Sequence, residues 1–153
     1  HAATWRPARP DEDDAIVALS LELFREDPSP HDPSADQVHR TLAAYRAEPV
    51  RGRAVVLDAG DHLGGYAFLA SFWSNELGGE VCVIDELYVA PTERGQGHGS
   101  ILLRTLAEQL CIGAGARAEF TFDRRAPAVV NHAHEAAVAA LIDSGAAVQG
   151  PNG

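Results

Sequence analysis

The stretch that decides the fold runs from Ile84 to Leu110 and reads IDELYVAPTERGQGHGSILLRTLAEQL. Its first part predicts a buried strand, because β-branched, aromatic and leucine residues dominate there: Val81, Val83, Ile84, Leu87, Tyr88 and Val89. Pro91 ends this strand, since proline supplies no backbone N–H to a sheet. The last part predicts an amphipathic helix with one apolar face: Leu102, Leu103, Leu106, Ala107 and Leu110.

Between the strand and the helix lies a glycine-rich turn, Arg94-Gly95-Gln96-Gly97-His98-Gly99. The first amides of a helix have no partner within the helix, and the helix dipole adds partial positive charge there. Glycines also let the backbone approach a ligand closely. The turn therefore predicts a binding site for phosphate oxygens. The alternative is a tight strand-to-helix connection with no ligand.

Two common phosphate-binding motifs do not fit this turn. A P-loop requires Gly-Lys followed by Ser or Thr, and that sequence does not occur. A dinucleotide-binding turn directly follows the first strand and has a third glycine, and this chain has Ser100 at the position of that glycine.

The turn and its flanks resemble the GCN5-related N-acetyltransferases, the GNAT superfamily. Residues 94–99 match the family signature R/Q-x-x-G-x-G/A, and Asp85–Pro91 and Leu102-Leu103 match the rest of its central motif. The resemblance covers residues 63–112 and extends over 4–62. It implies acetyl-CoA as co-substrate, with the pyrophosphate on the amides of Gln96 to Ser100. The cofactor-binding residues that it implies are Leu87, Tyr88, Val89, Arg94, Gly95, Gln96, Gly97, His98, Gly99 and Ser100.

Length and charge limit the classes of protein. A chain of 153 residues predicts one domain over residues 1–153 that buries about 70% of its unfolded surface. The net charge of −10 argues against nucleic acid and anionic membranes as partners, and it suits a cationic substrate. Cys82 and Cys111 form no C-x-x-C motif and predict buried, reduced thiols.

No membrane or export signal is visible in the sequence. No apolar run approaches the roughly 20 residues of a membrane helix, and no signal peptide is present, so a cytoplasmic protein is expected. His132 and His134 do not share a face if they lie on a helix, so no metal site is predicted. Whether a homodimer forms is left open.

The remaining elements predict a mixed sheet between helices. A helix capped by Asp11 ends at Asp27, before a proline, and Ser34 caps the next helix. The expected strands are Ala3–Pro7, Arg53–Leu57, Leu63–Trp73, the strand ending at Val89, and Ala118–Phe122; a late helix contains Val138, Leu141 and Ile142. This order predicts a three-layer α/β sandwich, with helices on both faces of the sheet, as in the GNAT-like fold.

Acetyl transfer to an amine needs a neutral nitrogen and a route for its proton. Glu86 is the first candidate for the base, because strand alternation places Glu86 and Tyr88 on the face opposite Leu87 and Val89. Asp85 is the second candidate, since a bulge in this strand would invert the alternation. The alternative is that both carboxylates are merely solvated or salt-bridged.

The sequence defines the general acid and the acceptor less closely than it defines the base. By the resemblance, Leu141 occupies the position at which the family has tyrosine, so Tyr88 is the nearby phenol that could serve as the acid. The acidic residues predict a small cationic amine as acceptor. The candidate acceptor-binding residues are Phe24, Glu26, Asp27, Trp73 and Glu76. Two classes of function remain: an N-acetyltransferase acting by direct attack, or a non-catalytic acyl-CoA-binding or interaction module.

Overall fold

The computed structural model describes residues 2–75, 79–102, 128–133 and 148–149. Its elements are, in order, β1 (Thr4–Pro7), the 3-10 helix η1 (Pro10–Glu12), α1 (Asp13–Glu26), α2 (Ala35–Ala47), β2 (Arg53–Asp58), β3 (Leu63–Ser74), β4 (Gly79–Val89), the 3-10 helix η2 (Pro91–Glu93), β5 (Ala128–Ala133) and β6 (Val148–Gln149). The first helices and strands follow the predicted order closely.

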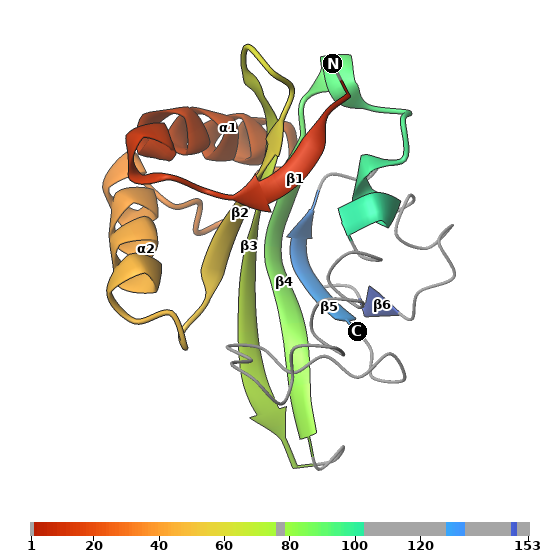
Figure 1. The fold of residues 1–153 in the computed structure, drawn as a ribbon. Coiled ribbons are helices and arrows are strands. Elements are labelled where there is room, and N and C mark those ends of the chain that lie inside the picture. The colour runs from red at the N-terminus through yellow and green to blue at the C-terminus, as the bar shows by residue number, and fades with distance from the viewer. Residues whose placement is uncertain (1, 76–78, 103–127, 134–147, 150–153) are drawn as a thin grey trace.

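The strands form one mixed sheet in the order β1-β2-β3-β4-β5-β6. The pairs from β1 to β4 are antiparallel, whereas β5 runs parallel to β4, and β6 runs parallel to β5. Figure 1 shows β4 in the middle of the sheet, between the long strand β3 and β5. The predicted mixed sheet is therefore confirmed.

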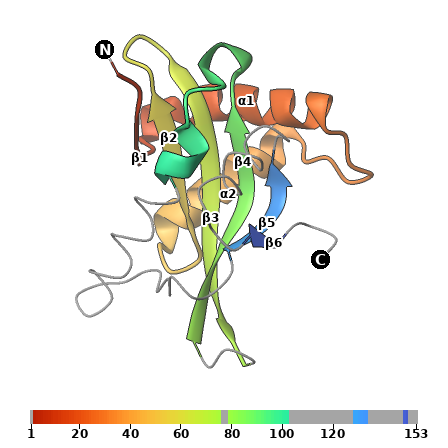
Figure 2. The same cartoon turned by 90° about the vertical axis from the view of Figure 1, so that its right-hand side faces the viewer.

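Helices lie on both sides of this sheet. In Figures 1 and 2, α1 and α2 cover one face, and the helical residues 98–102 lie on the other. Tyr66 and Phe68 of β3 pack against α1 and α2, while Ala67 and Leu69 alternate with them and are equally buried. The central part of β3 is thus covered on both faces, as its apolar sequence predicted.

The starts of the two long helices differ in how well the sequence predicted them. Ser34 caps α2 as expected: its hydroxyl accepts the Gln37 N–H at 3.2 Å, and the Gln37 side chain accepts the Ser34 N–H at 2.7 Å. The prediction that Asp11 caps the first helix is wrong, because Asp11 lies in η1 and α1 begins at Asp13. The Glu12 carboxylate instead accepts the Arg9 N–H at 2.8 Å, which stabilises the 3-10 turn.

The last quarter of the chain contains a strand that the sequence did not predict. β5 places His132 opposite Glu86 of β4, so His132 lies on a strand and not on a helix. Parallel pairing with β4 supplies the backbone hydrogen bonds, and no local pattern reports such a partner. The predicted strand Ala118–Phe122, the late helix with Leu141, and His134 and Cys111 lie outside the described residues.

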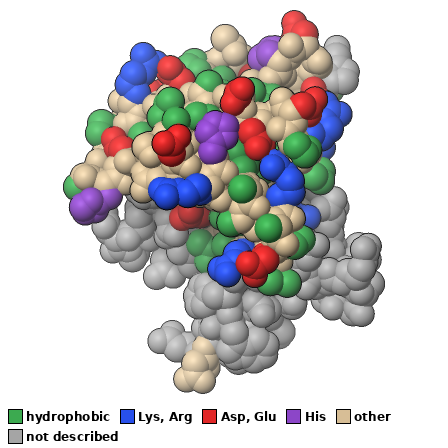
Figure 3. Space-filling model, turned by 90° about the vertical axis from the view of Figure 1, so that its left-hand side faces the viewer, with side chains coloured by type: hydrophobic (Ala, Val, Ile, Leu, Met, Phe, Trp, Pro, Cys, Tyr) green, Lys and Arg blue, Asp and Glu red, His purple; other side chains and the backbone are tan. Residues whose placement is uncertain are grey.

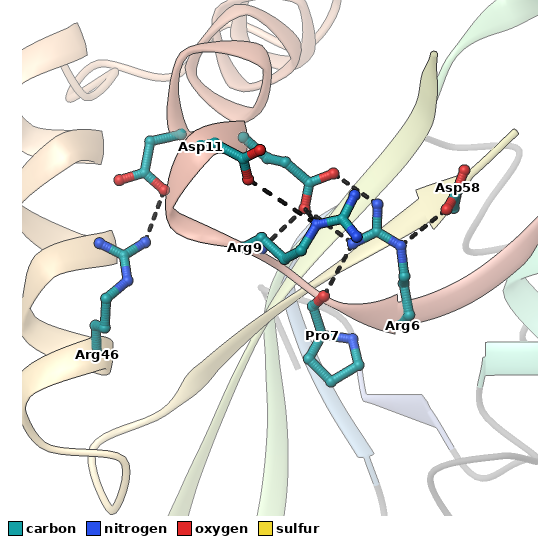
Figure 4. Close-up of polar contacts among 8 residues, drawn as sticks. Arg6, Pro7, Arg9, Asp11, Arg46 and Asp58 are labelled. Atoms are coloured by element: carbon teal, nitrogen blue, oxygen red, sulfur yellow. Dashed lines mark hydrogen bonds and ion pairs between the residues drawn. The ribbon is translucent and has the colours of Figure 1, made fainter. Parts of the chain in front are cut away.

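An ion-pair network fastens β1 to its neighbours (Figure 4). The Arg6 guanidinium binds both carboxylate oxygens of Glu12, at 2.9 and 2.6 Å, and donates to Asp58 of β2 at 2.9 Å. The hydrogen bonds from Arg6 hold the pKa of Glu12 and of Asp58 below their ordinary values. A bidentate contact of this kind is stronger and more directional than a single exposed ion pair.

We expect Arg6→Gln to reduce the free energy of unfolding at pH 7 by about 1 kcal/mol, because both carboxylates lose a charged donor. A lowered carboxyl pKa stabilises the fold above the ordinary pKa, near 4, and this stabilisation disappears as pH falls further. The difference between wild type and Arg6→Gln in urea denaturation should therefore shrink below about pH 4.

Arg9→Gln is the control, since Arg9 is 63% exposed and contacts Asp11 and Glu12 only at 3.9 and 3.7 Å. Equal losses of stability in Arg6→Gln and Arg9→Gln would contradict the assignment of this network to Arg6.

Candidate active site

A bulge in β4 sets the position of the two candidate bases. Phe68 of β3 pairs with Glu86, but the next residue, Leu69, pairs with Ile84. Asp85 is therefore the extra residue of the bulge. A β-bulge adds one residue to its strand and bends it. The residues on either side of the bulge, Ile84 and Glu86, therefore point to opposite faces of the sheet instead of the same face.

From the bulge onward the predicted alternation holds. Glu86 and Tyr88 are paired with Phe68 and Tyr66, the aromatic residues of β3 that pack against α1 and α2. Leu87 pairs with Ala67, which alternates with those aromatics on the opposite face. The face that the sequence predicted for Glu86 is therefore confirmed.

The Glu86 carboxylate is held by groups from two other elements. Its Oε1 atom accepts a hydrogen bond from the Tyr66 hydroxyl of β3 at 2.7 Å and a longer one from the Ser20 hydroxyl of α1 at 3.4 Å. Glu86 is 8% exposed, and both donors are fully buried. A buried carboxylate needs such donors, and they fix its orientation.

The phenols around these carboxylates have raised pKa values. Burial, followed by the negative charge of Glu86, raises the pKa of Tyr66 far above its ordinary value. Burial and the charges of Asp85 and Glu86 raise the pKa of Tyr45, on α2, to about 12. Burial and the hydrogen bond to Glu26 raise the pKa of Tyr88 to about 12. All three phenols stay protonated near neutral pH, and the hydroxyls of Tyr66 and Tyr88 act as hydrogen-bond donors.

The glycine turn has the backbone that the sequence predicted. Gly95 and Gly97 have φ angles of 79° and 80°, the left-handed region that favours glycine. The Ile101 N–H donates to the Gly97 carbonyl at 3.0 Å, which marks the beginning of the helix. A Cβ atom added at Gly95 or at Gly97 would meet no atom within 4 Å. The turn therefore has open space beside both glycines.

The residues between and after the two glycines differ in how deeply they are buried. Gln96 is exposed, Ser100 is half-buried, and His98 and Gly99 are buried. The Trp5 indole N–H of β1 donates to the His98 carbonyl at 2.8 Å, which joins the first strand to this helix. No local pattern predicts this contact, because 93 residues separate its partners.

Arg94 connects the turn to β4 and to α1. Its Nε atom donates to the Val89 carbonyl at 2.7 Å, and its Nη2 atom forms an ion pair with Glu26 at 2.9 Å. The guanidinium carbon lies 5.5 Å from the centre of the Tyr88 ring, and the Tyr88 hydroxyl donates to Glu26 at 3.0 Å. Sequence reasoning placed Glu26 among the acceptor-binding residues and missed this cluster.

Among the described residues, β5 already pairs with part of the β4 stretch that the resemblance assigned to cofactor binding. The ladder between β4 and β5 reaches the pair of Leu87 and Ala133. Val89 lies past that pair, and its carbonyl already accepts from Arg94. Backbone pairing with an extended ligand would thus begin after Leu87.

The other candidate acceptor-binding residues are spread out. Phe24 is buried in the core between α1 and the sheet. Asp27 is exposed directly after α1, and its N–H donates to the Leu23 carbonyl at 2.8 Å. The Trp73 backbone pairs with Glu80 in the sheet, but the Trp73 side chain and Glu76 lie outside the described residues.

The described part of the chain shows neither a metal site nor a membrane-spanning helix. That part contains no group of three His, Cys, Asp or Glu side chains placed to hold a metal ion. None of its helices combines the length and apolar character needed to cross a membrane.

Comparison with known proteins identifies relatives of this chain. The family model described as "Acetyltransferase (GNAT) family" matches residues 16–134. No curated protein matches the chain in sequence.

Several solved structures have a similar fold. An integron cassette protein from the mobile metagenome of the Cole Harbour salt marsh is 25% identical, with a TM-score of 0.66, over 90% of this chain and 80% of that one. A GNAT family acetyltransferase from Brucella melitensis in complex with acetyl-CoA is 23% identical, with a TM-score of 0.56, over 76% and 73%. A predicted acetyltransferase from Clostridium acetobutylicum with acetyl-CoA is 16% identical, with a TM-score of 0.60, over 76% and 77%.

The hydrogen bond between Tyr66 and Glu86 can be tested by stability. We expect Tyr66→Phe to reduce the free energy of unfolding by about 2 kcal/mol, because a buried carboxylate loses its shorter hydrogen bond. Tyr45→Phe is the control: the Tyr45 ring packs edge-on against Phe68, and within the described residues its hydroxyl has no hydrogen bond. If urea denaturation gives equal losses for both variants, the Glu86 carboxylate does not depend on Tyr66.

Proposed function

The chain belongs to the acetyltransferase (GNAT) family, and we propose that it moves the acetyl group of acetyl-CoA to the nitrogen of a small cationic amine by direct attack. Members of this family use acetyl-CoA as co-substrate. The observation that carries the proposal is the buried Glu86 carboxylate, oriented by Tyr66 and Ser20 on the strand that leads into the glycine turn.

The glycine turn suits the phosphates of acetyl-CoA. Gly95 and Gly97 leave open space where any side chain would project, and their positive φ angles help aim the amides that follow. The amides of Gln96 to Ser100 would hold the pyrophosphate at the beginning of the helix. The backbone of Tyr88 and Val89, past the last pair with β5 among the described residues, would contact the pantetheine arm.

Acetyl-CoA supplies the acetyl group as a thioester, whose C–S bond breaks as the new C–N bond forms. The amine nitrogen must lose a proton in this exchange, and we assign its acceptance to Glu86, directly or through water. Glu86 is nearly buried, so its small exposed part limits how the amine can approach. Asp85, half-buried at the bulge, is the alternative base.

We assign no phenol among the described residues as a general acid. The Tyr88 hydroxyl points its proton at Glu26, and its pKa of about 12 makes it a weak acid. A thiol has a pKa near 8.5, so a thiolate can leave without protonation and take a proton from water later. The site therefore supports a reaction with a base and no protein acid.

The charge of the chain supports a cationic acceptor. The net charge is −10, and Asp85 and Glu86 are adjacent at the bulge. Figure 3 shows that acidic side chains on the face formed by α1 and α2 lie among basic and histidine side chains. Two of these helices' carboxylates are paired: Asp13 with Arg46, and Asp14 with His39. The attraction would thus come from the whole molecule and from the bulge, rather than from one acidic patch on that face.

A panel of amines tests the proposal. With acetyl-CoA, small basic amines should release thiol faster than neutral or anionic amines, and their kcat/KM should fall as salt rises because ions screen the attraction. A preference for anionic acceptors would contradict the cationic assignment. Binding of acetyl-CoA without thiol release for any amine would favour a non-catalytic acyl-CoA-binding module.

The base is tested by two neighbouring substitutions. We expect Glu86→Gln, which keeps an oxygen for Tyr66, to lower kcat/KM at least about 100-fold, and Asp85→Asn to lower it less than about tenfold. The reverse order would transfer the role to Asp85. Circular dichroism checks that both variants fold.

The pH profile tests the acid. The kcat/KM of wild type should rise with pH to a plateau, without a falling limb below about pH 11. Tyr88→Phe should keep this shape. A falling limb in wild type that disappears in Tyr88→Phe would make Tyr88 the acid.

A further inference from the structure

The last residue of α1, Glu26, is tied to the first residue of the glycine turn. Its Oε2 atom lies 2.9 Å from Arg94 Nη2, and its Oε1 atom accepts the Tyr88 hydroxyl at 3.0 Å. The side chains of Glu26 and Arg94 are 26% and 22% exposed, so water screens this pair less than an exposed surface pair. Three elements therefore meet at one carboxylate: α1, β4 and the turn.

Arg94 transmits this contact to the backbone. Its Nε atom donates to the Val89 carbonyl at 2.7 Å, which links the end of β4 to the beginning of the turn across η2. A guanidinium suits this double contact with a carbonyl and a carboxylate, because its donors form a rigid planar fork. Because Arg94 directly precedes Gly95, the position of Arg94 determines where the glycine-rich backbone starts.

A ligand binds more tightly to the glycine turn if the turn is already ordered before binding. Gly95 and Gly97 have more conformational freedom in the unbound chain than other residues, and a ligand that must order them binds more weakly. Contacts that fix the turn before binding reduce this cost. Arg94 lies directly before Gly95, so a restraint on Arg94 acts where that freedom begins.

We propose that Glu26 is a positioning residue for acetyl-CoA: through Arg94 it presets the glycine turn, and it does not bind the acceptor amine. This inference rests on the proposed function. The Glu26 carboxylate is already compensated by the Arg94 charge, which makes it a poor partner for an ammonium group. Since α1 leads into the loop at residues 28–34, the same contact links that loop to the turn.

The sign of the expected effect separates positioning from simple charge. Acetyl-CoA is an anion, so loss of a carboxylate beside Arg94 should strengthen its binding if long-range charge alone matters. Positioning predicts the opposite result. We expect Glu26→Ala to weaken acetyl-CoA binding, measured by calorimetry, about tenfold and to raise the KM for acetyl-CoA, while kcat at saturation changes less than about threefold.

Glu22→Ala is the matched control. Glu22 lies on the same helix and is paired with an arginine, Arg25, but this pair is exposed. Both substitutions remove one negative charge, so the general effect on an anionic ligand cancels in the comparison. Glu26→Gln, which keeps oxygen and loses charge, should recover part of the affinity. Arg94→Lys in combination with Glu26→Ala should weaken binding no further than Arg94→Lys alone.

Hydrogen exchange of the turn amides in the ligand-free protein gives a second readout. Residues 95–100 should exchange faster in Glu26→Ala than in Glu22→Ala. Equal exchange, or acetyl-CoA binding in Glu26→Ala as tight as in Glu22→Ala, would overturn the positioning role. Failure of wild type to bind acetyl-CoA would instead overturn the proposed function, and the exchange comparison would still decide whether Glu26 presets the turn.

Discussion

A buried carboxylate sets the arrangement of this molecule. Glu86 lies beneath α1 in the middle of the sheet, where an unpaired charge would cost several kcal/mol. The Tyr66 and Ser20 hydroxyls that bind it come from β3 and α1, so the strand, its neighbour and the helix must lie in a fixed relation. A bulge at Asp85 keeps Glu86 on the helix side while Ile84 turns to the other face. The position of Glu86 and the packing around it thus depend on one local irregularity.

The glycine turn depends on a second set of polar contacts. Its glycines supply the backbone angles, but glycines alone do not hold one conformation. Arg94 attaches the turn to Val89 and Glu26, and the indole of Trp5 attaches the following helix to β1. The turn and the helix that follows it are therefore held by side chains from the beginning of the chain. A site whose supporting residues lie on regular elements is held more firmly than one built on a free loop.

The acidic residues of the chain have distinct roles, which cannot be read from their number alone. Glu12 and Asp58 fasten β1 through Arg6, and Glu26 binds Arg94. These carboxylates are compensated where they lie and contribute to stability or position. Asp85 and Glu86 lie next to each other at the bulge, and burial together with their charges raises the pKa of the neighbouring phenol Tyr45. Under the proposed function, the negative charge at the bulge adds to the net charge of −10 in attracting a cationic amine.

The sequence by itself determined the family, the mixed sheet, the glycine turn and the face on which Glu86 lies. Each follows from a local pattern: alternation in a strand, proline at its end, glycines before an apolar helix, and a serine cap on α2. Tertiary structure alone decided that β5 runs through His132, that Asp85 is the bulged residue, and that Glu26 binds Arg94. The physical reason is the same in all three cases. A parallel partner strand, a register shift and an ion pair over 68 residues arise between segments that are distant in sequence, and no local pattern contains that information.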